Sequence, residues 1–168
     1  QNTMIPNFNW SCTNIDSIKN ENELKEYIVL FPFCSAHLVA KKWPYYSVLV
    51  SQLKAKYQSK YHIFVAPGPK EIEESKSLNA KVILNNGKSL SITELISLIK
   101  RASFVIANDT GPAHICSHIN KAGLVLFGSH TSAHRVSIES EKFKSISVSD
   151  LNLLQTETVM EEIKKVLN

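Results

Sequence analysis

The chain has 168 residues, which fits one domain that is large enough for a sizeable hydrophobic core. Its hydrophobic content of 43% and charged content of 20% are ordinary for a globular protein. The net charge of +4 is mild, and the Lys and Arg residues are scattered, so the sequence does not indicate nucleic-acid binding. Its three cysteines are too widely spaced for a disulfide framework or a CxxC metal site, which favours a reducing compartment.

The first 26 residues predict a linker that leads into the domain. They are polar, contain Pro6 and several Asn residues, and end in a charged run. They have neither the basic flank nor the apolar core of a signal peptide, and no run in the whole chain is apolar enough to span a bilayer. Because Gln1 stands where an initiator Met is expected, we expect a piece of a longer protein, with one domain at 27–168.

Strands and helices are predicted to alternate through the first half of this domain. The apolar run 27–33 is typical of a buried parallel strand. Trp43-Pro44 then opens a helix with apolar residues at helical spacing, namely Tyr46, Leu49, Val50, Leu53 and Tyr57. Residues 61–66 predict the second strand, and the charged run 71–78 predicts a short surface helix.

The alternation continues to the end of the chain. A third strand at 80–84 ends in a turn at Asn85-Asn86-Gly87. Ser91 and Glu94 form a capping box that begins a helix, whose predicted apolar face is Ile92, Leu95, Ile96 and Ile99. Further strands are predicted at 104–107, 123–127 and 144–148, and further helices at 113–119 and 156–167. In the last helix, Val159, Ile163, Val166 and Leu167 are expected to point inward.

This order of elements predicts an α/β fold, a Rossmann-like doubly wound parallel sheet with helices on both faces. Ligands of such sheets bind outside the carboxyl ends of the strands. We therefore expect the loops that follow the strands to converge on one edge and to form the binding site. These loops are 34–42, 67–71, 85–90, 108–112 and 128–135.

The stretch from Phe104 to Ile115 is the strongest candidate for a binding site. Pro112 suits the first turn of a helix, and Gly111 lets a ligand approach the backbone closely. A strand that delivers free N–H groups at the start of a helix makes an anion site, and phosphate is its usual ligand. An ordinary strand-to-helix turn, capped by Asp109 or Thr110, is the alternative interpretation.

Other side chains on the expected edge can join such a site. Lys41, just ahead of a helix, can reach a phosphate, Glu71 can accept hydrogen bonds from ribose, and Asp109 can accept them from sugar hydroxyls. His114 can donate to a phosphate from inside its helix. Each also has a plain structural interpretation. Lys41 can be a solvated lysine, Glu71 part of a charged helix face, Asp109 a helix cap and His114 a packed core histidine.

Metal-dependent and nucleophilic chemistry find little support in the sequence. His114 and His118 lack the metalloprotease Glu between them, because Ile115 stands there, and Cys116 is too close for structural zinc spacing. The pair His130 and His134 has no further ligands at suitable spacing. There is no GxSxG elbow and no GxGxxG fingerprint after a strand, so we expect neither a metal nor a cofactor.

Three motifs together resemble glycosyltransferase family 9, the ADP-heptose:lipopolysaccharide heptosyltransferases. They are Lys41-Lys42-Trp43-Pro44, the D-T-G-x-x-H element from Asp109 to His114, and Leu126-Phe127-Gly128 before Thr131. Over residues 27–167, their order and spacing resemble the C-terminal, donor-binding domain of that family, which has the GT-B fold. The resemblance implies that Lys41 contacts phosphate, Glu71 lies near the nucleoside and Asp109 contacts the sugar. It also places Thr110, Gly111 and His114 around the diphosphate.

The resemblance further implies an inverting transfer without a divalent metal, to a lipopolysaccharide-type acceptor. The family's catalytic base, an Asp, lies in an N-terminal domain that this chain lacks, so we expect no transferase activity from the chain alone. A cytoplasmic enzyme at the inner face of the membrane is implied, with no transmembrane segment.

Two departures from the family leave other functions open. Phe33-Cys34-Ser35 replaces a small Gly-Ala/Ser turn, which predicts a bulky ring where the backbone approaches the donor. The loop from Gly128 to Thr131 is one residue longer than the family's G-x-T, and Ala133 replaces a common Pro, so the donor can differ from ADP-heptose. The alternatives are a non-catalytic nucleotide-binding module and a GT-B transferase that uses another nucleotide sugar.

Overall fold

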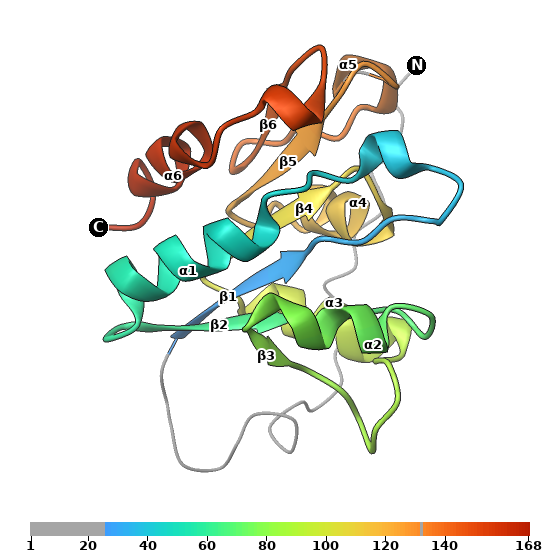
Figure 1. The fold of residues 1–168 in the computed structure, drawn as a ribbon, viewed down its shortest axis with the longest axis vertical. Coiled ribbons are helices and arrows are strands. Elements are labelled where there is room, and N and C mark those ends of the chain that lie inside the picture. Colours follow the sequence, from blue (N-terminus) through green and yellow to red (C-terminus); the bar gives the residue numbers. More distant parts are fainter. Residues whose placement is uncertain (1–25, 132) are drawn as a thin grey trace.

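The structure is a computed structural model that describes residues 26–131 and 133–168. Within these residues, six parallel strands form one sheet in the order β3-β2-β1-β4-β5-β6 (Figure 1). The order reverses direction between β1 and β4, and this switch point is where doubly wound sheets bind their ligands. The predicted Rossmann-like parallel sheet is therefore confirmed, while the linker expected at 1–26 lies, up to residue 25, outside the described residues.

The bounds of the elements follow the predicted alternation closely. The strands are β1 (Glu26–Phe31), β2 (Tyr61–Val65), β3 (Lys81–Val82), β4 (Phe104–Asn108), β5 (Gly123–Phe127) and β6 (Phe143–Ser147). The α-helices are α1 (Tyr46–Tyr57), α2 (Ile72–Ser75), α3 (Ile92–Arg101), α4 (Gly111–His118), α5 (Ala133–Val136) and α6 (Thr156–Lys164). Short 3-10 helices are η1 (Val39–Lys41), η2 (Lys76–Leu78) and η3 (Leu151–Leu153). The third strand is shorter than the predicted 80–84, and the helix expected from Trp43-Pro44 begins at Tyr46.

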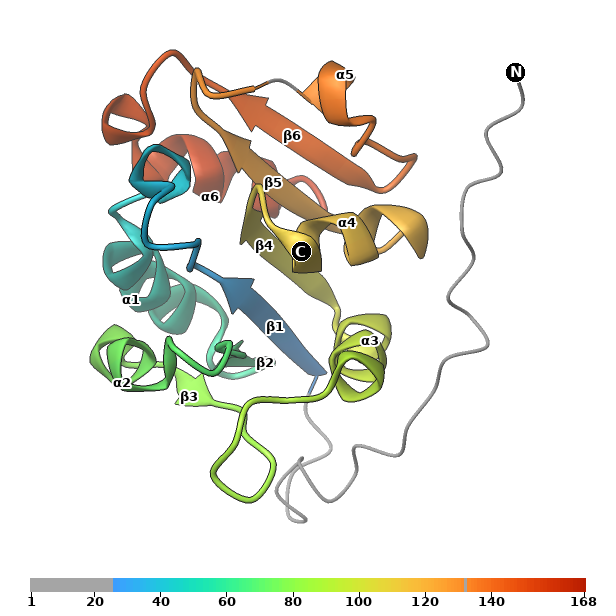
Figure 2. The same cartoon turned by 90° about the vertical axis from the view of Figure 1, so that its right-hand side faces the viewer.

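Helices cover both faces of the sheet, so the core has two layers (Figure 2). Alternate residues of β1 point to opposite faces, as the two-residue period of a strand requires. Ile28 and Leu30 pack in the cluster with α1 and α6, whereas Tyr27 and Val29 pack in the cluster with α3 and α4. All five predicted apolar residues of α1 are buried.

The predicted capping box at the start of α3 is confirmed. The Ser91 hydroxyl accepts from the Glu94 backbone N–H, and the Glu94 carboxylate accepts from the Ser91 backbone N–H at 2.8 Å. The predicted inward face of this helix is wrong at Ile92, which is 62% exposed because it is the first residue of the helix, outside the core. Val166, likewise predicted to point inward, is 51% exposed because it follows the end of α6.

Gly123 allows β5 to lie close to both neighbouring strands. A Cβ atom there would lie 2.4 Å from the backbone oxygen of Val105 and 2.9 Å from the ring of Phe143. The residue pairs with Val105 in β4 and with Phe143 in β6. Glycine at this position therefore permits the close packing of β5 between β4 and β6. No helix among the described residues is long and apolar enough to cross a bilayer.

Candidate functional site

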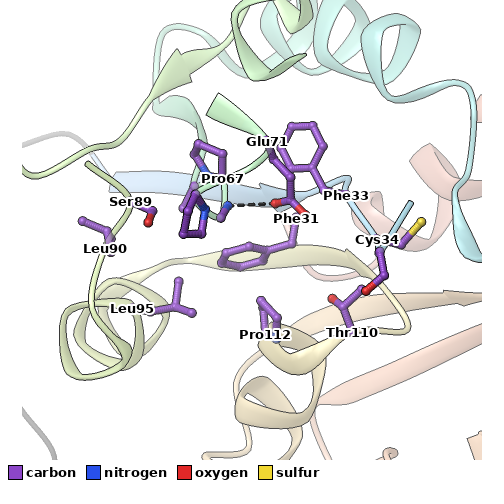
Figure 3. Close-up of a pocket in the computed structure, with 14 residues that line it drawn as sticks. Phe31, Phe33, Cys34, Pro67, Glu71, Ser89, Leu90, Leu95, Thr110 and Pro112 are labelled. Carbon is purple, nitrogen blue, oxygen red and sulfur yellow. Dashed lines mark hydrogen bonds between the residues drawn. The ribbon is translucent and has the colours of Figure 1, made fainter. Parts of the chain in front are cut away.

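The loops that follow β1, β2, β3 and β4 line one pocket of about 300 Å³ at the carboxyl edge of the sheet (Figure 3). Its apolar walls come from all four loop regions, namely Phe31, Phe33, Pro67, Leu90, Leu95 and Pro112. Cys34, Glu71, Ser89 and Thr110 supply polar atoms around these walls. The expected convergence of these loops is confirmed, and the fifth loop, after β5, reaches the same edge through His130.

Asp109 is the centre of a charged group beside this pocket. Its side chain is only 4% exposed, and its Oδ2 lies 3.0 Å from Lys41 Nζ and 3.2 Å from His130 Nε2. His114 Nε2 lies 3.8 Å from the other oxygen, Oδ1. An isolated carboxylate buried to this extent would be costly, so these cationic or hydrogen-bonding partners stabilise it.

Asn108 holds together the segments that carry these residues. The side chain is fully buried: Nδ2 donates to the backbone oxygen of Pro32 at 2.9 Å, and Oδ1 accepts from the Tyr46 hydroxyl at 3.2 Å. The same oxygen accepts from the backbone N–H of Trp43 at 3.4 Å. Asn108 thus fixes the segment from η1 to α1 against the end of β4, which brings Lys41 to Asp109.

Trp43 gives the Lys41 segment a second attachment. Its indole N–H donates to the backbone oxygen of Leu154 at 2.9 Å, and its ring packs edge-on against Tyr46 with centroids 5.1 Å apart. The Trp-Pro part of the motif is therefore structural, whereas the side chain of Lys41 enters the site. The neighbouring Lys42 instead pairs with Glu74 of α2.

The start of α4 presents backbone to this edge. Thr110 occupies the N-cap position, but its side chain makes no capping hydrogen bond and donates to the Asn108 carbonyl at 3.3 Å. Asp109 faces Lys41 and His130, so the alternative in which Asp109 or Thr110 serves as a side-chain cap is wrong. The Gly111 N–H has no partner within the helix. A Cβ at Gly111 would meet nothing within 4 Å, so a ligand can approach this backbone closely.

Glu71 lies on the pocket wall, as the sequence predicted, but one of its oxygens is already used. Oε2 accepts from the backbone N–H of Gly68 at 2.8 Å and so fixes the loop after β2. Glu71 also stands at the N-cap of α2. The other carboxylate oxygen, Oε1, is the one left for a ribose hydroxyl. That contact stays a prediction.

Phe33 forms part of the pocket wall, so the expected obstruction of the donor by its ring stays a prediction. The ring is only 6% exposed and packs in the core cluster that contains Trp43 and Tyr46. Phe33 lies just after β1, and its ring packs on the α1 face of the sheet. Burial raises the pKa of the neighbouring Cys34 thiol above its ordinary value, despite the opposing charge of Lys42.

His130 is the site residue that sequence reasoning missed. In the sequence, His130 stands out only as a metal-ligand candidate paired with His134, whose side chain lies outside the described residues. The sequence feature that could have pointed to His130 is the extra residue in the loop after β5. Among residues 26–131 and 133–168, no cluster of three His, Cys, Asp or Glu side chains is arranged to hold a metal ion.

The fold and the site thus define a Rossmann-like domain in which a helix starts with open backbone beside an apolar pocket. The family model for glycosyltransferase family 9 (heptosyltransferase) matches residues 5–165, and the chain belongs to this family. The match begins inside the segment that the sequence analysis expected to be a linker. No curated protein matches the sequence at a significant level.

Solved structures with the same fold include two-domain glycosyltransferases of the GT-B class. E. coli heptosyltransferase WaaC with ADP has a TM-score of 0.73 at 20% identity, over 86% of this chain and 45% of its own. E. coli ADP-heptose lps heptosyltransferase II has a TM-score of 0.75 at 19% identity, over 91% of this chain and 49% of its own. The UDP-GlcNAc 2-epimerase of Methanocaldococcus jannaschii has a TM-score of 0.60 at 16% identity, over 92% of this chain and 44% of its own. The chain therefore spans less than half the length of these proteins.

Proposed function

We propose that this chain is the C-terminal, donor-binding half of an inverting glycosyltransferase, and that its donor is a nucleoside diphosphate sugar, expected to be ADP-heptose. The observation that carries the proposal is the pairing of Lys41 with Asp109, which directly precedes Thr110, the N-cap residue of α4 and part of the pocket wall. This arrangement offers a hydrophobic site, a cation and a hydrogen-bond acceptor side by side. A nucleobase, a diphosphate and a sugar need these three features in that order.

The pocket suits the nucleoside part of such a donor. Its volume of about 300 Å³ is at the lower end of the range for ligand sites, so it fits a base and ribose better than a whole nucleotide sugar. Phe31, Leu95 and Pro112 supply flat and aliphatic surfaces for the base. Glu71, whose second oxygen is not used by Gly68, is placed to accept from a ribose hydroxyl.

The start of α4 and Lys41 suit the diphosphate. The Gly111 N–H and the helix dipole favour an anion at this point, and a lysine is a mobile point charge. Lys41 is 24% exposed, so its ammonium group can turn from Asp109 to a phosphate without leaving a closed core. In the transfer reaction, these groups would stabilise the negative charge that develops on the leaving diphosphate.

Transfer requires a base that removes the proton of the acceptor hydroxyl, and the resemblance to the family places that base in an N-terminal domain. We therefore expect donor binding, but no turnover, from this chain alone. The same resemblance supports a lipopolysaccharide-type acceptor at the inner face of a membrane for the complete enzyme.

Two other functions remain as alternatives. A non-catalytic nucleotide-binding module is favoured by Phe33, whose ring is mostly buried in the core but also forms part of the pocket wall. A transferase that uses another nucleotide sugar is favoured by the fold likeness to an epimerase whose structure holds UDP-GlcNAc and UDP. The longer loop after β5 also favours it, because this loop reaches Asp109, the expected sugar contact.

Calorimetric titration of the 168-residue chain with ADP, ADP-heptose, UDP and GDP-sugars tests the proposal. We expect binding of ADP, and tighter binding of ADP-heptose. A preference for a uridine or guanosine conjugate would support the second alternative, and binding of bare nucleotides without a contribution from the sugar would support the first. No binding of any of these ligands would overturn the proposal.

A further inference from the structure

Two side chains from different loops share one oxygen of Asp109. Lys41 Nζ lies 3.0 Å and His130 Nε2 lies 3.2 Å from Oδ2. A carboxylate oxygen has two lone pairs, so it can accept from both groups at once. Among the described residues, Oδ1 has only the more distant His114, at 3.8 Å, which is beyond hydrogen-bonding distance. The two oxygens of Asp109 therefore have different surroundings, one occupied by two partners and one open to a ligand.

The His130 ring is held in place to make this contact. It stacks on Phe127, with ring centroids 6.0 Å apart and planes 28° from parallel, and its side chain is 12% exposed. Nδ1 is buried and has no hydrogen-bond partner within the described part of the chain. Nε2 is thus the ring nitrogen with a protein partner, and the contact to Asp109 requires a proton on it.

We propose that His130 is a positioning residue for the sugar of the donor, acting through Asp109. This inference rests on the proposed function, in which Lys41 moves from Asp109 to the diphosphate. When Lys41 leaves, a carboxylate that is only 4% exposed would lose its nearest partner. His130 keeps the hydrogen bond to Oδ2, so Asp109 stays fixed with Oδ1 directed to the sugar hydroxyls.

A purely structural function of His130 makes a different prediction. If the ring only fills the space beside Phe127, a phenyl ring would replace it and a flexible amide would not. If the N–H donor matters, a flexible amide would replace the histidine and a phenyl ring would not. Glutamine has an N–H donor at similar reach without an aromatic ring, and phenylalanine has the ring without the donor.

The experiment compares the sugar increment, which is the ratio of ADP-heptose affinity to ADP affinity, in three forms of the 168-residue chain. We expect His130→Phe to lower this ratio about tenfold, the value of one good hydrogen bond, and to leave ADP affinity nearly unchanged. We expect His130→Gln to keep a ratio close to that of the wild type. His130→Ala, which also lacks the donor, replaces His130→Phe if the phenyl variant does not fold.

The possible outcomes separate the inference from the proposed function. An unchanged ratio in His130→Phe, or an equal loss in both variants, would overturn the positioning function while donor binding by the wild type stands. A wild type that shows no sugar increment would overturn the proposed function, and this inference with it. Loss in His130→Phe with rescue in His130→Gln supports the inference.

Discussion

Lys41 and Asp109 lie 68 positions apart in the chain, yet Lys41 Nζ lies 3.0 Å from Asp109 Oδ2. Sequence reasoning assigned them to different parts of a ligand, the phosphate to Lys41 and the sugar to Asp109. In the structure they bind each other. Under the proposed function, donor binding is an exchange of partners: the ammonium group would give up one anion for another, and the carboxylate would depend on its remaining contacts.

The first prediction concerns the charge of Lys41. Lys41→Ala should weaken ADP binding about tenfold or more at low salt, because a hydrogen bond to a charged group is lost. The difference from wild type should shrink as salt rises, since ionic contacts are screened. Titrations with ADP across a series of salt concentrations measure this difference in affinity. Lys42→Ala is the matched control, because that lysine pairs with Glu74 instead. Equal affinities of Lys41→Ala and wild type would mean that this lysine does not contact the donor.

The second prediction separates two functions of Asp109. Asp109→Ala should remove the sugar increment, because the acceptor for the sugar hydroxyls is lost. Affinity for bare ADP should be kept or rise slightly, since Lys41 no longer has to leave a carboxylate. Calorimetry with both ligands gives the two values. Equal losses for ADP and ADP-heptose would mean that Asp109 only maintains the structure.

The third prediction concerns Asn108 as the link between three segments. Asn108→Ala should lower the free energy of unfolding by about 2–4 kcal/mol, because it leaves buried partners such as the Trp43 N–H and the Tyr46 hydroxyl unpaired. Urea denaturation measures the loss. Gln58→Ala, at an exposed amide, is the control and should change stability by less than about 0.5 kcal/mol. A similar small effect at both positions would contradict the proposed link.

Local patterns predicted most of the fold. The strands were recognisable because parallel strands buried on both faces are continuous apolar runs, and the capping box because its two partners are three residues apart. The edge of the sheet followed from the order of the elements alone. The errors at Ile92 and Val166 have one cause: the helical period extends past the point where the core ends.

The site was only partly predictable, because its contacts join distant loops. Spacing and residue type identified Asp109 and Lys41, but not that they pair. His130 lies 21 positions from Asp109 and comes from a loop whose course depends on the sheet. The direction of the Phe33 ring likewise depends on the packing of α1 against β1, which no local pattern records.

The fourth prediction follows from the position of Phe33. Phe33→Ala should cost about 3–5 kcal/mol of stability, because it removes a buried ring from the core instead of clearing the donor site. Phe33→Leu, which keeps an apolar side chain, should cost clearly less and leave ADP affinity unchanged. Denaturation and titration together measure this. Tighter ADP binding by a stable Phe33→Leu variant would show that the ring does obstruct the ligand.

The last prediction concerns acid stability and the capping box of α3. Hydrogen bonds from the Ser91 backbone and the Asn85 side chain hold the pKa of Glu94 below its ordinary value. A carboxyl group with a lower pKa in the folded state stabilises the fold above the unfolded-state value of about 4.3, and this contribution is lost as the pH falls through the folded-state pKa. The stability difference between wild type and Glu94→Gln should therefore be present at neutral pH and disappear in acid. Ser91→Ala should lose about 1 kcal/mol at neutral pH, because the helix loses its N-cap acceptor. Denaturation at several pH values measures both, and a wild-type advantage over Glu94→Gln that stays constant into acid would show that the ionised carboxylate contributes nothing.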